Sequence, residues 1–195
     1  MQLYLNTSSP YARVVRVCLY EKELMERTEL CWCDPWAADS ELLKITPLSR
    51  IPTLVTEGGE VLTESLLIAH YLDAVGEGAK LLPADGLAET LALSGLGQGL
   101  MEAAFNVVIG RKHGGPDVDE TLLGNRRLKA IERTLVTLEA HPSVLATLGA
   151  IVVAVALAYL SFRLPAFDWP NRFPRLQVWF AKVTECDSFA LTAFE

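Results

Sequence analysis

Cysteine and histidine are scarce in this chain of 195 residues. The cysteines are Cys18, Cys31, Cys33 and Cys186, and the histidines are His70, His113 and His141. No Cys-x-x-Cys pair occurs, and the histidines are scattered without the short spacing of metal ligands. We therefore expect neither a disulfide framework nor a metal site.

Positive charge is also in short supply. The 17 lysine and arginine residues are outnumbered by 24 aspartate and glutamate residues, which gives a net charge of −7. Because phosphate backbones are bound by clustered cations, nucleic acid is not an expected partner. The amino terminus lacks a basic stretch followed by a long apolar run, so we predict no secretory signal and a cytoplasmic location.

One long uncharged run is present, from Ser143 to Phe162. It could just span a bilayer, which takes about 20 apolar residues. The run is nevertheless rich in alanine and lies between amphipathic segments that need a partner to pack on. A helix that is apolar all round also occurs at the centre of a helical bundle. We predict a core helix and no membrane contact.

The first part of the chain alternates between strand and helix patterns. The expected strands are 2–5, 29–33, 53–56 and 60–62, and the expected helices are 10–22, 41–45 and 64–75. Gly58 and Gly59 separate two apolar runs, which is a strong hairpin signal. The order βαβαββα is that of a thioredoxin-like domain, which we place at residues 1–76.

The rest of the chain is predicted to be all-α. A glycine-containing, charged stretch that ends in proline, 76–83, indicates a linker, which we place at residues 77–86. The expected helices are 87–109, 119–140, 143–162 and 174–185. The predicted fold class is thus α/β plus all-α, with the helical domain at 87–195.

The segment from Pro47 to Ser65 has features of a site for a small peptide. A proline after Ile51 can hold a cis bond, which would turn the backbone of Ile51 outward to pair with an extended ligand. Glu64 and Ser65 precede an apolar helix, where free N–H groups, the helix dipole and a hydroxyl converge on a carboxylate.

These residues resemble the glutathione-binding half of the glutathione S-transferase family. The family pattern Asn-Pro-x-Gly-Lys-Val-Pro is matched by residues 46–52, Thr-Pro-Leu-Ser-Arg-Ile-Pro, and its Glu-Ser pair by residues 64–65. Thr46, Ser49 and Arg50 depart from the pattern but keep a turn and a cation. The Ser9-Pro10-Tyr11 sequence is similar to the start of the first helix in the tau and omega classes.

The resemblance implies a homodimeric enzyme that joins the sulfur of glutathione, its co-substrate, to a small electrophile. Ser9 would donate its hydroxyl to the sulfur, with Ser8 as the alternative, and Arg50 would meet the glycyl carboxylate. Ile51, Pro52, Glu64 and Ser65 would hold the peptide. Without the resemblance, Ser9 is an ordinary helix cap that accepts the N–H of Ala12.

Two other functions fit the same fold. One is a non-catalytic protein of the stringent starvation protein A type, because a fold does not determine a function. The other is a glutathione-dependent thiol reductase, which needs a reactive cysteine near the sulfur. Cys18 lies about two helical turns beyond Ser9 and is expected to point inward, so it is a poor candidate.

Overall fold

The first part of the chain folds around a mixed sheet. The structure is a computed structural model that describes residues 1–37, 40–140 and 147–195. Within these residues the strands are β1 (Gln2–Leu5), β2 (Glu29–Trp32), β3 (Thr53–Val55) and β4 (Val61–Thr63). They form a sheet of order β2-β1-β3-β4, in which β1 is parallel to β2 and antiparallel to β3, and β3 is antiparallel to β4.

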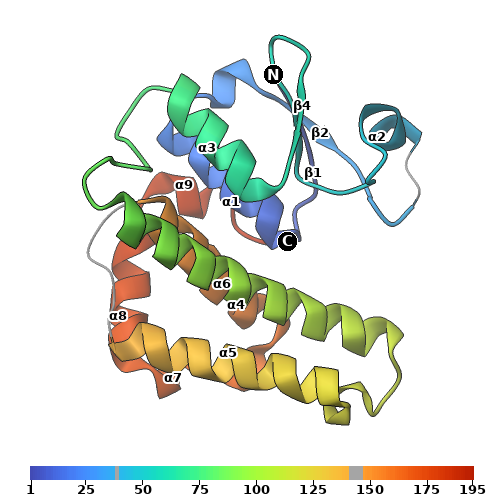
Figure 1. The fold of residues 1–195 in the computed structure, drawn as a ribbon, viewed down its shortest axis with the longest axis vertical. Helices are drawn as coiled ribbons and strands as arrows, with labels where there is room; N and C mark the ends of the chain where they lie inside the picture. The colour runs from blue at the N-terminus through green and yellow to red at the C-terminus, as the bar shows by residue number, and fades with distance from the viewer. Residues whose placement is uncertain (38–39, 141–146) are drawn as a thin grey trace. The chain divides into compact units, whose positions relative to one another are not determined.

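The helices between these strands and directly after them are α1 (Pro10–Glu21), α2 (Ser40–Ile45) and α3 (Ser65–Val75). Helices α1 and α3 contact each other on one side of the strands (Figure 1). Their apolar faces supply much of the core, together with the fully buried Leu3, Leu5 and Leu54 of the sheet. The predicted βαβαββα order of a thioredoxin-like domain is confirmed.

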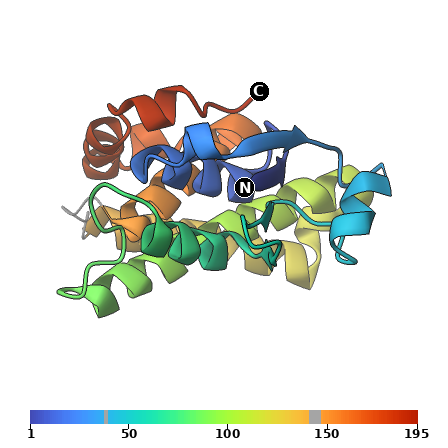
Figure 2. The ribbon, with the colours of Figure 1, turned by 90° about the horizontal axis from the view of Figure 1, so that it is seen from above.

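The carboxyl-terminal segment packs against α1. The short helix α9 (Asp187–Ala190) contacts α1, and the two lie side by side in Figures 1 and 2. Arg13 of α1 is buried, donates to the Phe189 carbonyl at 3.1 Å, and lies 4.5 Å from the ring centre of Phe194. Burial, with a smaller contribution from Arg16, lowers the pKa of Arg13 to about 10. Sequence analysis did not foresee this contact.

The second compact unit is helical. Its longer helices are α4 (Leu87–His113), α5 (Leu122–Ala140), α6 (Leu148–Arg163) and α8 (Pro174–Val183), and α7 (Trp169–Arg172) is a single turn. Short 3-10 helices span Met25–Arg27 in the first unit, and Val118–Glu120 and Pro165–Phe167 in the second. The predicted helices are present, although α4 continues four residues beyond Ile109 and the predicted start at Ser143 lies outside the described residues.

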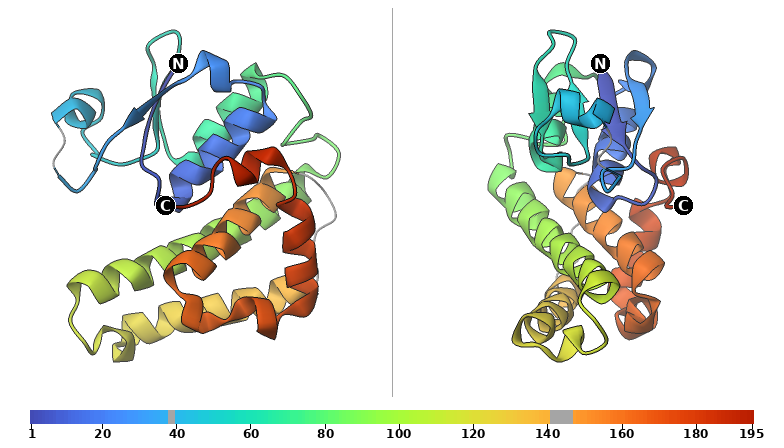
Figure 3. Two further views of the ribbon diagram at one scale, coloured as in Figure 1. Left: turned by 180° about the vertical axis from the view of Figure 1, so that it is seen from behind. Right: turned by 90° about the vertical axis from the view of Figure 1, so that its right-hand side faces the viewer.

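Helix α6 is the core of the helical unit. Almost all of its side chains between Leu148 and Leu160 are buried, and it packs along α4 (Figure 3). The two backbones approach closely at Gly97, where a Cβ would lie 2.8 Å from the Val153 nitrogen. The structure therefore agrees with the core-helix interpretation of the apolar run.

By length and apolar composition alone, a second helix besides α6 resembles a membrane span. Within the described ranges, α4 has the length and hydropathy of a membrane span. Helix α6 meets that test only together with residues 165–172, from which it is bent by 103°. One or two such helices are weak evidence for a span, because the core helices of bundles have the same composition.

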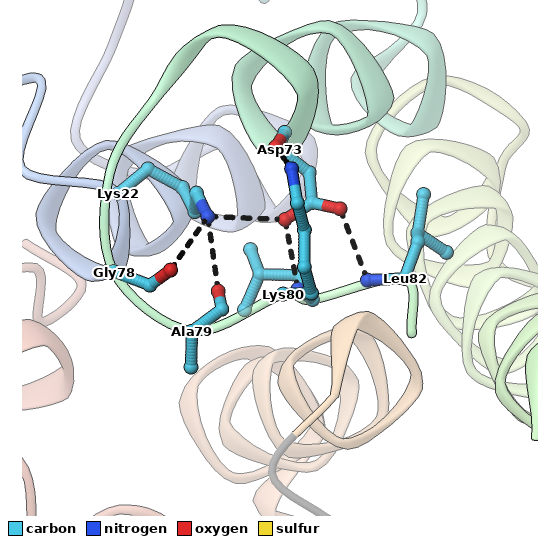
Figure 4. Close-up of polar contacts among 7 residues, drawn as sticks. Lys22, Asp73, Gly78, Ala79, Lys80 and Leu82 are labelled. Carbon is cyan, nitrogen blue, oxygen red and sulfur yellow. Dashed lines mark hydrogen bonds and ion pairs between the residues drawn. The ribbon is translucent and has the colours of Figure 1, made fainter. Parts of the chain in front are cut away.

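A buried ion pair holds the segment that follows α3. Lys22 at the end of α1 and Asp73 of α3 lie 3.2 Å apart, and Lys22 also donates to the Ala79 carbonyl at 2.9 Å. Asp73 accepts the backbone N–H groups of Leu81 and Leu82 (Figure 4).

By contacts, residues 1–82 and 187–195 form one unit and 83–186 the other. The domain boundaries at 76 and 87 stay a prediction.

Candidate functional site

The sheet register gathers three separate segments at one edge. Tyr4 of β1 is paired with Thr53 of β3, and Thr53 is paired with Thr63 of β4. The end of β1, the start of β3 and the end of β4 therefore lie next to one another. The loop from Asn6 to Ser9, the Ile51-Pro52 pair and the Glu64-Ser65 pair all leave the sheet at this edge.

Ser9 begins α1 as its cap. Its extended backbone (φ −77°, ψ 121°) and the Pro10 ring at the first helical position start the helix, and its Oγ accepts the N–H of Ala12 at 3.2 Å. The predicted capping contact is confirmed. The Ser9 hydroxyl proton has no acceptor within the described residues, so a ligand atom at the helix start could accept it. Ser8 is half-buried directly before it.

Asn6 is a residue of this edge that sequence analysis missed. Its Oδ1 accepts the Ser9 N–H at 2.8 Å, which fixes the loop that carries the two serines. An asparagine a few residues before a helix start is a recognised turn signal, because its side chain mimics a backbone acceptor. That signal was available in the sequence.

The turn before β3 has the expected form. The Ile51–Pro52 bond is cis, and the Ile51 N–H has no partner in the part of the chain that the structure describes. Ser49 has a φ of 48°, in the left-handed region where the family pattern has glycine. Thr46 accepts the Leu48 N–H at 3.3 Å, so the threonine that replaces asparagine still closes the turn.

The start of α3 combines a strained residue with an unpaired hydroxyl. Glu64 has a φ of 66° and a ψ of 116°, a conformation that is costly outside glycine and is concentrated at functional sites. The Glu64 side chain accepts no hydrogen bond from the backbone N–H groups in the first turn of α3. Ser65 is only 3% exposed, and its Oγ has no hydrogen-bond partner among the described residues. Free N–H groups at a helix start and an unpaired hydroxyl are the kinds of donor that can bind a negatively charged ligand.

Arg50 and Glu64 form a loose surface ion pair. The closest nitrogen and oxygen are 3.8 Å apart, and both side chains are mostly exposed. Exposed pairs of this kind contribute little to stability, so either side chain can leave its partner for a ligand. The role of Arg50 at a glycyl carboxylate stays a prediction.

The cysteines differ in their suitability as nucleophiles. Cys18 is completely buried, and this burial, together with Glu21 and Asp73, strongly raises the pKa of its thiol. Burial followed by Glu29 also raises the pKa of Cys31. Within residues 1–37, 40–140 and 147–195, no group of three or more His, Cys, Asp or Glu side chains could hold a metal ion.

Comparison with known proteins gives consistent matches. The sequence profile of the glutathione S-transferase N-terminal domain matches residues 8–75. An uncharacterized GST-like protein of Escherichia coli K12, YibF, is 32% identical over 203 residues, which cover 98% of each chain.

Solved structures agree with this match along the whole chain. The structure of a glutathione transferase family member from Pseudomonas fluorescens Pf-5, with bound glutathione, is 32% identical with a TM-score of 0.92, and the alignment covers 100% of this chain and 98% of that one. A glutathione S-transferase from Methylobacterium radiotolerans, in complex with glutathione sulfonate, is 27% identical with a TM-score of 0.87, covering 100% and 95%.

Proposed function

The chain belongs to the glutathione S-transferase family, and from this premise we propose that it binds glutathione and joins the sulfur to a small electrophile. The observation that carries the proposal is that three unsatisfied donors belong to segments that leave the sheet at one edge. These are the Ser9 hydroxyl, the Ile51 N–H and the buried Ser65 hydroxyl.

The peptide would be held by groups from two loops. The outward-facing backbone of Ile51, next to Pro52, would pair with the extended peptide as an added strand. Ser65 and the first N–H groups of α3 would bind one carboxylate, and Arg50 would bind the other. The Pseudomonas fluorescens relative has been solved with glutathione and with S-(propanoic acid)-glutathione, which supports a glutathione site in this family.

Ser9 would supply the chemistry. A free thiol has a pKa of about 8.5, so only a few per cent is thiolate at neutral pH. A hydroxyl donor and the amino end of α1 together favour the thiolate by about one to two pKa units. The site would also hold the thiolate close to the electrophile, and this positioning by itself accelerates the attack. Ser8 is the alternative donor.

The pH dependence of conjugation tests the role of Ser9. With a general electrophile such as 1-chloro-2,4-dinitrobenzene, Ser9→Ala should lower the rate near neutral pH about ten-fold, and the two rates should converge at high pH as free thiolate forms. Ser8→Ala is the matched control. If Ser8→Ala shows the shift and Ser9→Ala does not, the donor is Ser8. If neither shifts the profile, the proposed activation is wrong.

A non-catalytic binding protein remains the second candidate, since family membership does not establish turnover. Calorimetric titration with glutathione separates it from the enzyme, because absence of heat at millimolar glutathione would favour a binding module. The thiol reductase alternative is disfavoured by the buried, poorly acidic Cys18. Loss of activity in Cys18→Ser, with activity retained in Ser9→Ala, would restore it.

We also propose a cytoplasmic homodimer. Several large apolar side chains of the first unit are exposed, among them Val61 of β4 and Leu67 and Val75 of α3. Leu67 is 65% exposed, and burial of such side chains drives association. Leu67→Glu should therefore halve the mass measured by light scattering, whereas Leu122→Glu, at a 90% exposed leucine outside this set, should not.

A further inference from the structure

One face of α8 carries an apolar surface with one cationic side chain at each end of it. Arg175, Val178, Trp179 and Lys182 follow the spacing i, i+3, i+4 and i+7, which places them on one face of the helix. With Pro174 they line a shallow groove whose surface is almost wholly apolar. We call this set of five residues the α8 groove. Val178 is 71% exposed although it is a valine.

The opposite face of α8 is firmly anchored. Leu176 is buried, and Phe180 packs edge-on against Trp169 with ring centres 5.2 Å apart. The Glu139 carboxylate of α5 accepts the N–H groups of Arg175 and Leu176 at 3.1 and 2.7 Å. The helix backbone that carries the groove is therefore held in place, and a partner would not have to order it on binding.

The charge of the groove is opposite to that of the protein. The chain has a net charge of −7, yet neither Arg175 nor Lys182 forms an ion pair with any described residue. The two cations are seven residues apart, which is about 10 Å along a helix. Apolar side chains lie between them. The complement of this pattern is an apolar strip flanked by two acidic side chains at the same separation.

We propose that the α8 groove binds an amphipathic helix of a partner protein that carries two acidic residues seven positions apart, with apolar residues between them. A shallow open surface does not enclose a small molecule, which prefers a cleft that buries most of its area. A helix laid along α8 would present its own i, i+3, i+4 and i+7 side chains at matching intervals. The two acidic side chains of the partner helix would set its orientation along α8, and the apolar residues between them would supply the affinity.

The test is a titration with a designed peptide. The probe is a labelled, capped helix of about 15 residues built from alanine, leucine and glutamate, with Glu-x-x-Leu-Leu-x-x-Glu at its centre. Fluorescence anisotropy should give a dissociation constant in the micromolar range. Val178→Ser should weaken binding about ten-fold, as should the double variant Arg175→Glu with Lys182→Glu.

A charge swap separates recognition from general attraction. The same peptide with lysine in place of its two central glutamates should bind the double variant and not the native protein. Lys129→Glu, at an exposed lysine of α5, is the matched control and should leave binding unchanged. Circular dichroism would check that the variants, all at exposed positions, unfold as the native protein does.

Three results would overturn the proposal. One is no binding at millimolar peptide. Another is equal loss of binding in Lys129→Glu, which would mean nonspecific charge attraction. The third is binding to phosphatidylglycerol vesicles that depends on Val178 while the peptide does not bind, which would assign the groove to a lipid surface. None of these measurements depends on glutathione, so their failure is distinct from failure of the proposed transferase activity.

Discussion

Replacing Ser65 with alanine should change stability and glutathione binding in opposite directions. The Ser65 Oγ is buried at the start of α3 and has no partner among the described residues, so in the free protein it has lost its water without gaining a hydrogen bond. A buried, unsatisfied hydroxyl costs about 1–3 kcal/mol. Removing it relieves that cost and breaks no existing contact.

The size of each effect follows from this geometry. Relief of the unpaired hydroxyl should raise the free energy of unfolding by about 1 kcal/mol, or about 2–4 °C in Tm for a chain of this length. Glutathione binding should weaken by about 10–100-fold, because a hydrogen bond to a charged group contributes about 1.5–3 kcal/mol. Ser9→Ala provides the contrast, since it removes the cap on Ala12 and should cost about 1 kcal/mol.

Urea unfolding and calorimetric titration with glutathione measure the two quantities on the same samples. Spectroscopic and calorimetric transitions should be compared first, because a chain with two compact units need not unfold in one step. The reasoning fails if Ser65→Ala does not raise the free energy of unfolding of the free protein. It fails equally if the variant binds glutathione as tightly as the native protein does.

Other outcomes follow from packing and charge. The free energy of unfolding in urea should be about 1–3 kcal/mol lower for Gly97→Ala than for Gly99→Ala. Both variants gain helix propensity, but only a Cβ at Gly97 meets the α6 backbone. Equal free energies of unfolding would contradict this. Asp73→Asn should cost about 3–5 kcal/mol at neutral pH by leaving Lys22 buried without its counterion. Burial opposes ionisation of Asp73, but the Leu81 N–H, Lys22 and the Leu82 N–H outweigh it and lower the pKa. The native protein should therefore lose this stability as pH falls through that lowered pKa, and unfolding at acid pH should show a smaller loss in the variant.

Local signals were sufficient for much of the fold. The hairpin at Gly58 and Gly59, the helix start at Ser9 and Pro10, and the alternation of apolar residues each depend on neighbours in the chain, and the structure has the strands and helices that they predict. The cis bond before Pro52 also follows a local motif. The limits of α4 were less predictable, because Gly110 and the charged residues after it stay helical in the structure.

Other features depend on residues that are distant in the sequence. Nothing near Lys22 indicates that it would be buried against Asp73 and the Ala79 carbonyl. Likewise, Arg13 gave no sign of being covered by the carboxyl-terminal segment more than 170 residues away.

For this protein, the sequence by itself determined the order of strands and helices and the chemistry of the turns, because those depend on backbone preferences over a few positions. Only the tertiary structure decided that the Ser65 hydroxyl has no partner, that Lys22 and Asp73 share a buried pair, and that α8 exposes an apolar surface between two cations. The physical reason is that solvation and pairing depend on everything that packs around a side chain, and those neighbours come from distant parts of the chain.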